Sequence, residues 1–377
     1  MKNKKLLTIL GVLAFLTVVA IGIYKYRPRS TDDNDIRIGA VLTLSGNVSY
    51  WSYELKKGMD IAAEFINSDT NASCEIRIVY EDNAFNPQRA ISACKKLLLT
   101  EDIDVFVSCF TPMCQAVSPI CRESNKPILL TITSATDIAA NQDGVYRDYI
   151  TQQQQCPPLA EYVFNDMGMH RGVFLVLADD YGRDGVSEFS NRFSELGGDI
   201  QTGEFFSTSD LSIKDPVQKI LSEDPEFVFV IAGAQPLLNA CKQIREINEK
   251  VQIVGLTAFD SDDVWQSLGE IGNGVVFSSS YFEQTTNNAR FFTAFQNRNK
   301  RMPNATNIYG FSIVEYLYEL GVKSRLTQCS IQQLLAQMDN VESIRGVLHM
   351  NENHDVISPI GIYQRENGKS VIKKVVK

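Results

Sequence analysis

The sequence is poor in histidine and contains none of the common catalytic motifs. Only three of its 377 residues are histidine, and no Cys-x-x-Cys pair occurs, so we do not expect a zinc site. Neither the Gly-x-Ser-x-Gly turn of many hydrolases nor the His-Glu-x-x-His zinc motif is present. The phosphate-binding pattern Gly-x-x-x-x-Gly-Lys-Ser/Thr is also missing. These absences argue against an enzyme and against a metal or other cofactor.

Excess positive charge is absent from most of the chain. Residues 1–35 contain six Lys and Arg and three Asp and Glu, a balance of +3. Because the whole chain carries −9, the remaining 342 residues carry −12. Nucleic acids attract proteins through basic surfaces, so this acidic region is a poor candidate for nucleic-acid binding.

The first 35 residues contain a long hydrophobic run. Residues 6–24, LLTILGVLAFLTVVAIGIY, form 19 residues without a charge between the basic stretches MKNKK and KYRPR. A cleaved signal peptide and an uncleaved membrane anchor both fit this pattern. The run approaches the ~20 residues that cross a bilayer, exceeds the ~7–15 of most signal peptides and lacks an Ala-x-Ala cleavage triplet, which favours the anchor. We therefore expect export, with the domain anchored by residues 6–24 at the periplasmic or extracellular face of the cytoplasmic membrane.

Cysteine is not scarce. There are eight, and five of them fall between residues 74 and 121. An exported protein folds where disulfides can form, so this clustering indicates local bridging. Spacing alone does not give the pairing, and buried free thiols remain the alternative for any of the eight.

From residue 36 onward, strand-like and helix-like segments alternate. The strand-like residues 36–44 precede a helical pattern at 53–67, and the strand-like residues 75–82 precede another at 87–99. The alternation restarts after residue 158. This pattern is typical of doubly wound parallel sheets, so the expected fold class is α/β with two such lobes.

Polar stretches without a helical pattern separate the two series. They lie near residues 150–157, 279–288 and 351–355, and three crossings between two lobes would make a hinged clamshell. The expected divisions are residues 1–35 as a signal peptide or anchor with linker, 36–151 plus 281–352 as the N-terminal lobe, and 152–280 plus 353–377 as the C-terminal lobe.

Three loops directly follow predicted strands, where open α/β sheets bind ligands. The first contains Ser45 and Gly46, the second is the hydroxyl-rich TITSATD at residues 131–137, and the third contains Tyr181 within ADDYGRDG. In the second loop, Ser134 and Thr136 are two apart and can face the same way in an extended segment. A plain turn or a helix N-cap is the alternative explanation for each loop.

These motifs, taken in order, resemble the type I periplasmic binding proteins, specifically the branched-chain amino-acid (leucine/isoleucine/valine) branch. The segments that carry the resemblance run from residue 36 to about residue 370 and include IRIGAVLTLSG, EDNAFNP, ITSATD, ADDYGRDG, LGGDI, FFTAFQNRN and GVLHMNENHD. The resemblance implies a clamshell that closes on a small polar ligand, an amino acid or a related amide or carboxylate, and delivers it to an ABC permease. A binding module that a signalling partner senses is the alternative. The ligand-binding residues that it implies are Ser45, Gly46, Trp51, Thr111, Ser134, Ala135, Thr136, Tyr181 and Asp260.

The sequence departs from the family pattern at three positions of that implied site. Pro112 falls where a ligand-binding hydroxyl is expected, so Thr111 has to replace it. Ala234 stands in place of a second-lobe tyrosine, and Thr257 in place of the acidic residue that pairs with the ligand's ammonium. A desolvated ammonium needs a charged partner or strong acceptors. Either Asp260 fills that role, or the ligand is not a standard α-amino acid.

Overall fold

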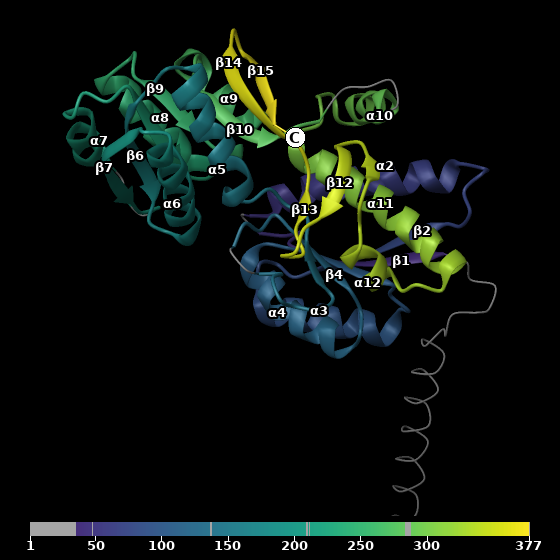
Figure 1. Cartoon of the computed structure of the whole chain (residues 1–377). Helices are drawn as coiled ribbons and strands as arrows, with labels where there is room; N and C mark the ends of the chain where they lie inside the picture. The colour runs from purple at the N-terminus through teal and green to yellow at the C-terminus, as the bar shows by residue number, and fades with distance from the viewer. Residues whose placement is uncertain are drawn as a thin grey trace, which may run out of the picture.

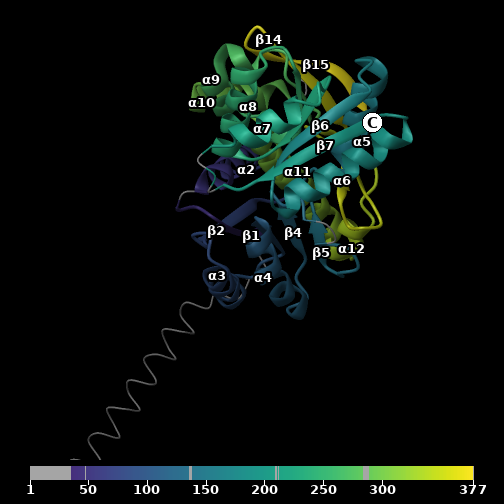
Figure 2. The same cartoon turned by 90° about the vertical axis from the view of Figure 1, so that its left-hand side faces the viewer.

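The computed structural model describes residues 35–46, 48–135, 138–208, 210, 212–282 and 288–376. The hydrophobic run at residues 6–24 lies outside this part of the chain. Within the described residues, no helix is both long and apolar enough to cross a membrane. Figures 1 and 2 show two lobes, each built on its own sheet.

The first lobe contains a parallel sheet of five strands in the order β2-β1-β3-β4-β5. The strands are β1 (Ile36–Leu42), β2 (Ile76–Asp82), β3 (Val105–Cys109), β4 (Ile128–Thr131) and β5 (Val145–Arg147). The helices α3 (Pro87–Thr100) and α4 (Thr111–Glu123) cover one face. The other face carries α2 (Ser49–Ser68), α11 (Ala305–Thr327) and α12 (Ile331–Ala336). The sheet is therefore doubly wound, as expected.

The second lobe contains a sheet of seven strands in the order β15-β14-β10-β9-β8-β6-β7. Five strands are parallel: β6 (Arg171–Leu177), β7 (Asp199–Phe206), β8 (Phe227–Ile231), β9 (Gln252–Gly255) and β10 (Val276–Ser280). The antiparallel β14 (Ile360–Glu366) and β15 (Lys369–Val376) extend one edge. One face carries α5 (Gln152–Glu161) and α6 (Asp180–Glu195), and the other carries α7 (Lys214–Leu221), α8 (Ala234–Ile247) and α9 (Asp262–Leu268).

Three chain crossings connect the lobes. The first leads from β5 to α5, the second from β10 to α10 (Ala289–Asn299), and the third from a small sheet to β14. The small sheet consists of β11 (Val341–Ser343), β12 (Gly346–Met350) and β13 (Val356–Ile357). A buried ion pair joins the first-lobe ends of the first and third crossings. Arg147, the last residue of β5, donates two hydrogen bonds of 2.7 and 2.9 Å to Asp355, which directly precedes β13.

The stretch near residues 150–157 was expected to be free of helix, and this prediction is wrong. The helix α5 begins there because Thr151 and Gln154 form a reciprocal capping box. The Thr151 hydroxyl accepts a hydrogen bond from the Gln154 N–H (3.2 Å), and the Gln154 side chain accepts one from the Thr151 N–H (3.0 Å). Pro157 and Pro158 lie inside this helix rather than ending it.

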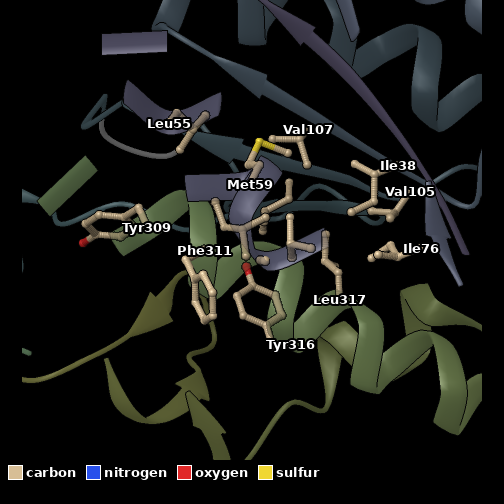
Figure 3. Close-up of a cluster of buried hydrophobic side chains, with 14 of the residues drawn as sticks. Ile38, Leu55, Met59, Ile76, Val105, Val107, Tyr309, Phe311, Tyr316 and Leu317 are labelled. Atoms are coloured by element: carbon tan, nitrogen blue, oxygen red, sulfur yellow. The ribbon is translucent and has the colours of Figure 1, made fainter. Parts of the chain in front are cut away.

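The helices α2 and α11 pack unusually closely in the first-lobe core. A Cβ atom on Gly58 would lie 1.9 Å from the carbonyl oxygen of Asn307, and one on Gly310 would lie 2.0 Å from that of Leu55. Only glycine permits backbones to approach this closely. Figure 3 shows part of the core that results, in which α2 and α11 pack against the sheet. This packing holds α11 in place, and α11 supplies part of the cavity wall described below.

Candidate functional site

A cavity of about 940 Å³ lies between the two lobes. Its wall includes residues that lie one or two positions after strands of both sheets: Phe110 after β3, Ile132 after β4, Asp179 after β6 and Thr257 after β9. The carboxyl ends of parallel strands meet at one edge of a sheet, and loops there are free to vary around a rigid frame. The topology of both sheets therefore directs these loops into a shared cleft.

The cleft contains five of the nine residues that were predicted to bind ligand. These are Trp51, Thr111, Ser134, Tyr181 and Asp260. Ser45, Gly46 and Ala135 are absent from the described wall of the cavity. Thr136 lies outside the described residues. The role of all nine in binding stays a prediction.

The loop that contains Ser45 is closed on its own lobe. The Ser45 hydroxyl donates to Asp82 Oδ2 (2.6 Å), and the Leu44 N–H donates to Asp82 Oδ1 (2.8 Å). Desolvation raises the pKa of Asp82, but these two hydrogen bonds and one from the Ala84 N–H together outweigh it and leave the pKa lowered. Asp82 thereby holds the end of β1 beside the end of β2.

Two bulky residues adopt left-handed backbone conformations at the first-lobe wall. Phe110 has φ of 66° and Ile132 has φ of 49°. Such conformations are rare for residues with a bulky or branched Cβ, cost about 1–3 kcal/mol each, and concentrate at binding sites. Beside them, the hydroxyls of Thr111 and Thr133 share a hydrogen bond of 2.7 Å. The helix α4 begins at Thr111, so its partially positive N-terminal end faces the cavity.

The second-lobe wall presents a carboxylate and a tyrosine. Asp260 Oδ2 accepts a hydrogen bond from the Ser279 hydroxyl (2.9 Å), which lies 2.9 Å from the hydroxyl of Thr257. Asp179 caps α6 by accepting a hydrogen bond from the Gly182 N–H (2.9 Å), and the first turn of this helix holds Tyr181 at the cavity. Burial raises the pKa of Tyr181, so its phenol stays neutral.

The described wall combines aromatic rings and hydroxyl groups with two carboxylates. The aromatic residues are Tyr50, Trp51, Phe85, Phe110, Tyr149, Tyr181 and Tyr309. The ionisable acids are Asp179 and Asp260, and the described wall contains no Lys, Arg or His. Arg345 packs behind the Tyr309 ring, 4.3 Å from its centroid, but Asp148 pairs with it. The cleft therefore favours neutral or positively charged ligand groups over anions.

The sequence matches the family model described as periplasmic binding protein over residues 35–369. This chain belongs to the periplasmic binding protein family. Among curated relatives, the Leu/Ile/Val-binding protein homolog 3 of Brucella melitensis is 22% identical over 346 residues, which cover 89% of this chain and 93% of that protein. The family consists of substrate-binding proteins rather than enzymes, and it implies a location outside the cytoplasm.

Solved structures of binding proteins share the fold at low identity. The branched-chain amino acid transporter substrate-binding protein LivJ of Streptococcus pneumoniae, in complex with isoleucine, has a TM-score of 0.80 and 18% identity, covering 91% of this chain and 99% of that chain. A solute-binding protein of Rhodopseudomonas palustris BisB5, in complex with 3,4-dihydroxybenzoic acid, has a TM-score of 0.77 and 19% identity, covering 91% and 97%. The two-lobed α/β fold expected for this binding protein is confirmed.

Sequence reasoning missed most of the aromatic wall of this binding protein. The rings of Phe85 and Phe110 form an edge-to-face pair with centroids 5.6 Å apart, and Tyr149 and Tyr309 lie at the same distance. Phe110 could have been found, because it directly follows a predicted strand. Tyr309 lies within the buried helix α11, where its spacing does not distinguish it from core residues.

Proposed function

We propose that this protein captures a small ammonium-bearing ligand, an amino acid or a related amide, between its two lobes and delivers it to an ABC importer. One observation supports this ligand class above all: the described wall of the interlobe cavity combines two carboxylates with seven aromatic rings and has no basic side chain. An ammonium gains from a carboxylate and from aromatic faces, whereas a buried anion beside two carboxylates is penalised. Relatives that bind amino acids and relatives that bind aromatic acids are both known, and the charge of this cleft favours the first.

The proposed binding mode assigns one polar ligand group to each lobe. Asp260 on the second lobe accepts hydrogen bonds from the ligand's ammonium. The hydroxyls of Thr111, Ser134 and Thr136, together with the N-terminal end of α4, bind its carboxylate or amide on the first lobe. Trp51 and Tyr181 cover its side chain from opposite lobes. Ser45 and Gly46, on the first-lobe loop at the cleft mouth, and Ala135, next to Ser134, are the other ligand-binding residues that the resemblance implies.

A panel of candidate ligands tests this function by calorimetric titration of the purified protein. The panel contains the twenty amino acids, their amides, and two anions without an ammonium, benzoate and 3,4-dihydroxybenzoate. We expect binding of at least one amino acid or amide and no binding of the two anions. If benzoate or 3,4-dihydroxybenzoate binds more tightly than every amino acid and amide in the panel, the proposed ligand class is overturned.

Substitution of the proposed ammonium partner sharpens this test. Asp260→Asn keeps the shape and removes the charge, and hydrogen bonds to charged groups contribute roughly 1.5–3 kcal/mol, so affinity should fall about 10- to 150-fold. The matched control is Glu223→Gln, which removes a carboxylate from an exposed position of the same lobe. Equal affinity in the two variants would exclude Asp260 from the site.

We further propose that the divisions 36–151 plus 281–352 and 152–280 plus 353–377 move as lobes about the three crossings, and that residues 6–24 anchor the protein. Hinge closure around a ligand is a common transition. X-ray scattering should show a smaller radius of gyration at ligand saturation. N-terminal sequencing of membrane-extracted protein should return residues ahead of position 6, whereas a start near Thr31 would indicate a cleaved signal peptide.

A further inference from the structure

Two buried cysteines meet between neighbouring helices of the first lobe. The Sγ atoms of Cys94 on α3 and Cys121 on α4 lie 3.6 Å apart. Both residues are fully buried in the core between these helices and the sheet, against neighbours such as Leu97 and Val117. Among the described cysteines, this is the one pair whose sulfurs approach within hydrogen-bonding distance.

We propose that Cys94 and Cys121 form a disulfide when the protein folds in the oxidising compartment to which its family is exported. A disulfide has sulfurs about 2.05 Å apart, so the two atoms need to approach by only about 1.5 Å. Exported proteins fold where disulfides persist. The clustering of five cysteines between residues 74 and 121 fits a short-range bridge of this kind.

The oxidation is a thiol–disulfide exchange with a small-molecule or protein disulfide, written RS–SR. The Cys94 thiolate attacks one sulfur of RS–SR, which forms a mixed disulfide and releases RS⁻. The Cys121 thiolate then attacks the Cys94 sulfur and releases the second RS⁻. Two thiols and RS–SR thus give one protein disulfide and two RSH. In the folded chain the hydrogen bond from Cys121 lowers the pKa of the Cys94 thiol, but both thiols are then buried, so the first attack belongs to folding, before the core closes.

The cross-link would join two helices that lead out of the ligand cleft. The chain enters α3 just after Phe85 and enters α4 just after Phe110, and both phenylalanines line the cavity. The bond would restrict the unfolded chain across 28 residues, from 94 to 121, without touching the three crossings. It should therefore stabilise the first lobe and leave lobe closure unchanged.

Thiol counting tests the pairing directly. The full chain, exported through its own N-terminal segment, is denatured and alkylated with and without prior reduction. We expect six of the eight cysteines to react before reduction and all eight after it. Peptide mass spectrometry should link residues 90–95 to residues 97–122, and fragmentation of the linked peptides should place the bond on Cys121 rather than on Cys109 or Cys114. If all eight react without reduction, or if Cys94 is linked to a different cysteine, the proposal is wrong.

Variants separate this pair from the other cysteines of the same core. Cys121→Ala should return Cys94 as a free thiol, whereas the control Cys114→Ala, also buried on α4, should keep the cross-link. In the wild type and in the control, reduction should lower the unfolding temperature by about 5–10 °C. In Cys121→Ala that redox dependence should vanish, whatever the variant's own stability. A persistent dependence there would contradict the assignment.

Discussion

Removal of Arg345 alone should destabilise the protein far more than removal of Arg345 together with its partner Asp148. Arg345 and Asp148 are both almost completely inaccessible to solvent, and Arg345 Nη2 donates to Asp148 Oδ2 at 2.5 Å. Arg345 also donates to the Ser312 hydroxyl (3.1 Å), and the Tyr316 hydroxyl donates to Asp148 (3.0 Å). Arg345→Met would leave the Asp148 carboxylate buried with a phenol as its remaining partner.

The expected cost follows from the burial of this pair. Breaking a buried ion pair by removing one partner costs about 3–5 kcal/mol, because the other charge stays buried and unpaired. Replacing both partners is often nearly neutral. Among the described residues, Asp148 Oδ1 and Arg345 Nη1 have no hydrogen-bond partner, so the pair does not fully recover its desolvation cost. We expect Asp148→Asn/Arg345→Met to lie within about 1–2 kcal/mol of the wild type.

The single variant should also acquire a distinctive pH dependence. Burial raises the pKa of Asp148, and Arg345 opposes that rise in the wild type. Without Arg345, the pKa of Asp148 in the folded state rises further above that in the unfolded state. Folding then favours the protonated acid, so stability is retained at low pH and lost as the pH rises through the folded-state pKa. Arg345→Met should therefore be less destabilised at pH 5 than at pH 8.

Urea unfolding of the wild type, Arg345→Met and the double variant at pH 5 and pH 8 measures these free energies. The double variant should recover at least about 2 kcal/mol of the single variant's loss at pH 8. It should also lose the additional pH dependence. The reasoning would be refuted by a double variant as unstable as Arg345→Met at pH 8.

Two further predictions concern α11. Burial raises the pKa of Glu315 from an ordinary 4.5 to about 7, although its carboxylate accepts a hydrogen bond from the Ile344 N–H (3.0 Å). Folding therefore favours the protonated acid, and the contribution of Glu315 to stability is lost as the pH rises from about 4.5 to 7. Glu315→Gln should remove up to about 3 kcal/mol of that loss, and thermal melts at pH 5 and pH 8 should diverge less than in the wild type. Gly310→Ala places a Cβ 2.0 Å from the Leu55 carbonyl oxygen and should lower the free energy of unfolding in urea by about 3 kcal/mol. The control Gly233→Ala, with open space around its Cβ, should lower it little. Equal losses of stability in the two variants would contradict this account of the packing.

The alternation of strands and helices was predictable because buried parallel strands are continuous hydrophobic runs. The strand β8, for example, reads FVFVI and is buried along its whole length. The antiparallel edge of the second sheet was not predictable in the same way. Its strand β15 contains only exposed and half-buried residues, and the pairing of β14 with β10 depends on a chain that returns from the first lobe.

Several residues of the cleft were predictable because they lie shortly after the end of a strand. Thr111, Ser134 and Tyr181 lie within a few residues of β3, β4 and β6, and all three reach the cavity. Tyr309 lies within α11 and has no such local signal, and Tyr149 follows the three-residue strand β5, which the sequence pattern does not predict. Their rings lie 5.6 Å apart although they are far apart in the sequence.

Tyr309 connects the cleft to the crossings between the lobes. Its ring lines the cavity, and its hydroxyl shares a 2.6 Å hydrogen bond with that of Ser280, where β10 leads into the second crossing. Behind the ring, Arg345 pairs with Asp148, which directly follows β5 at the start of the first crossing. A ligand that packs on Tyr309 therefore contacts a residue bonded to one crossing and stacked on a buried charge pair at another. Because these contacts are dense and buried, we expect a shift of the ring to displace the chain at both crossings.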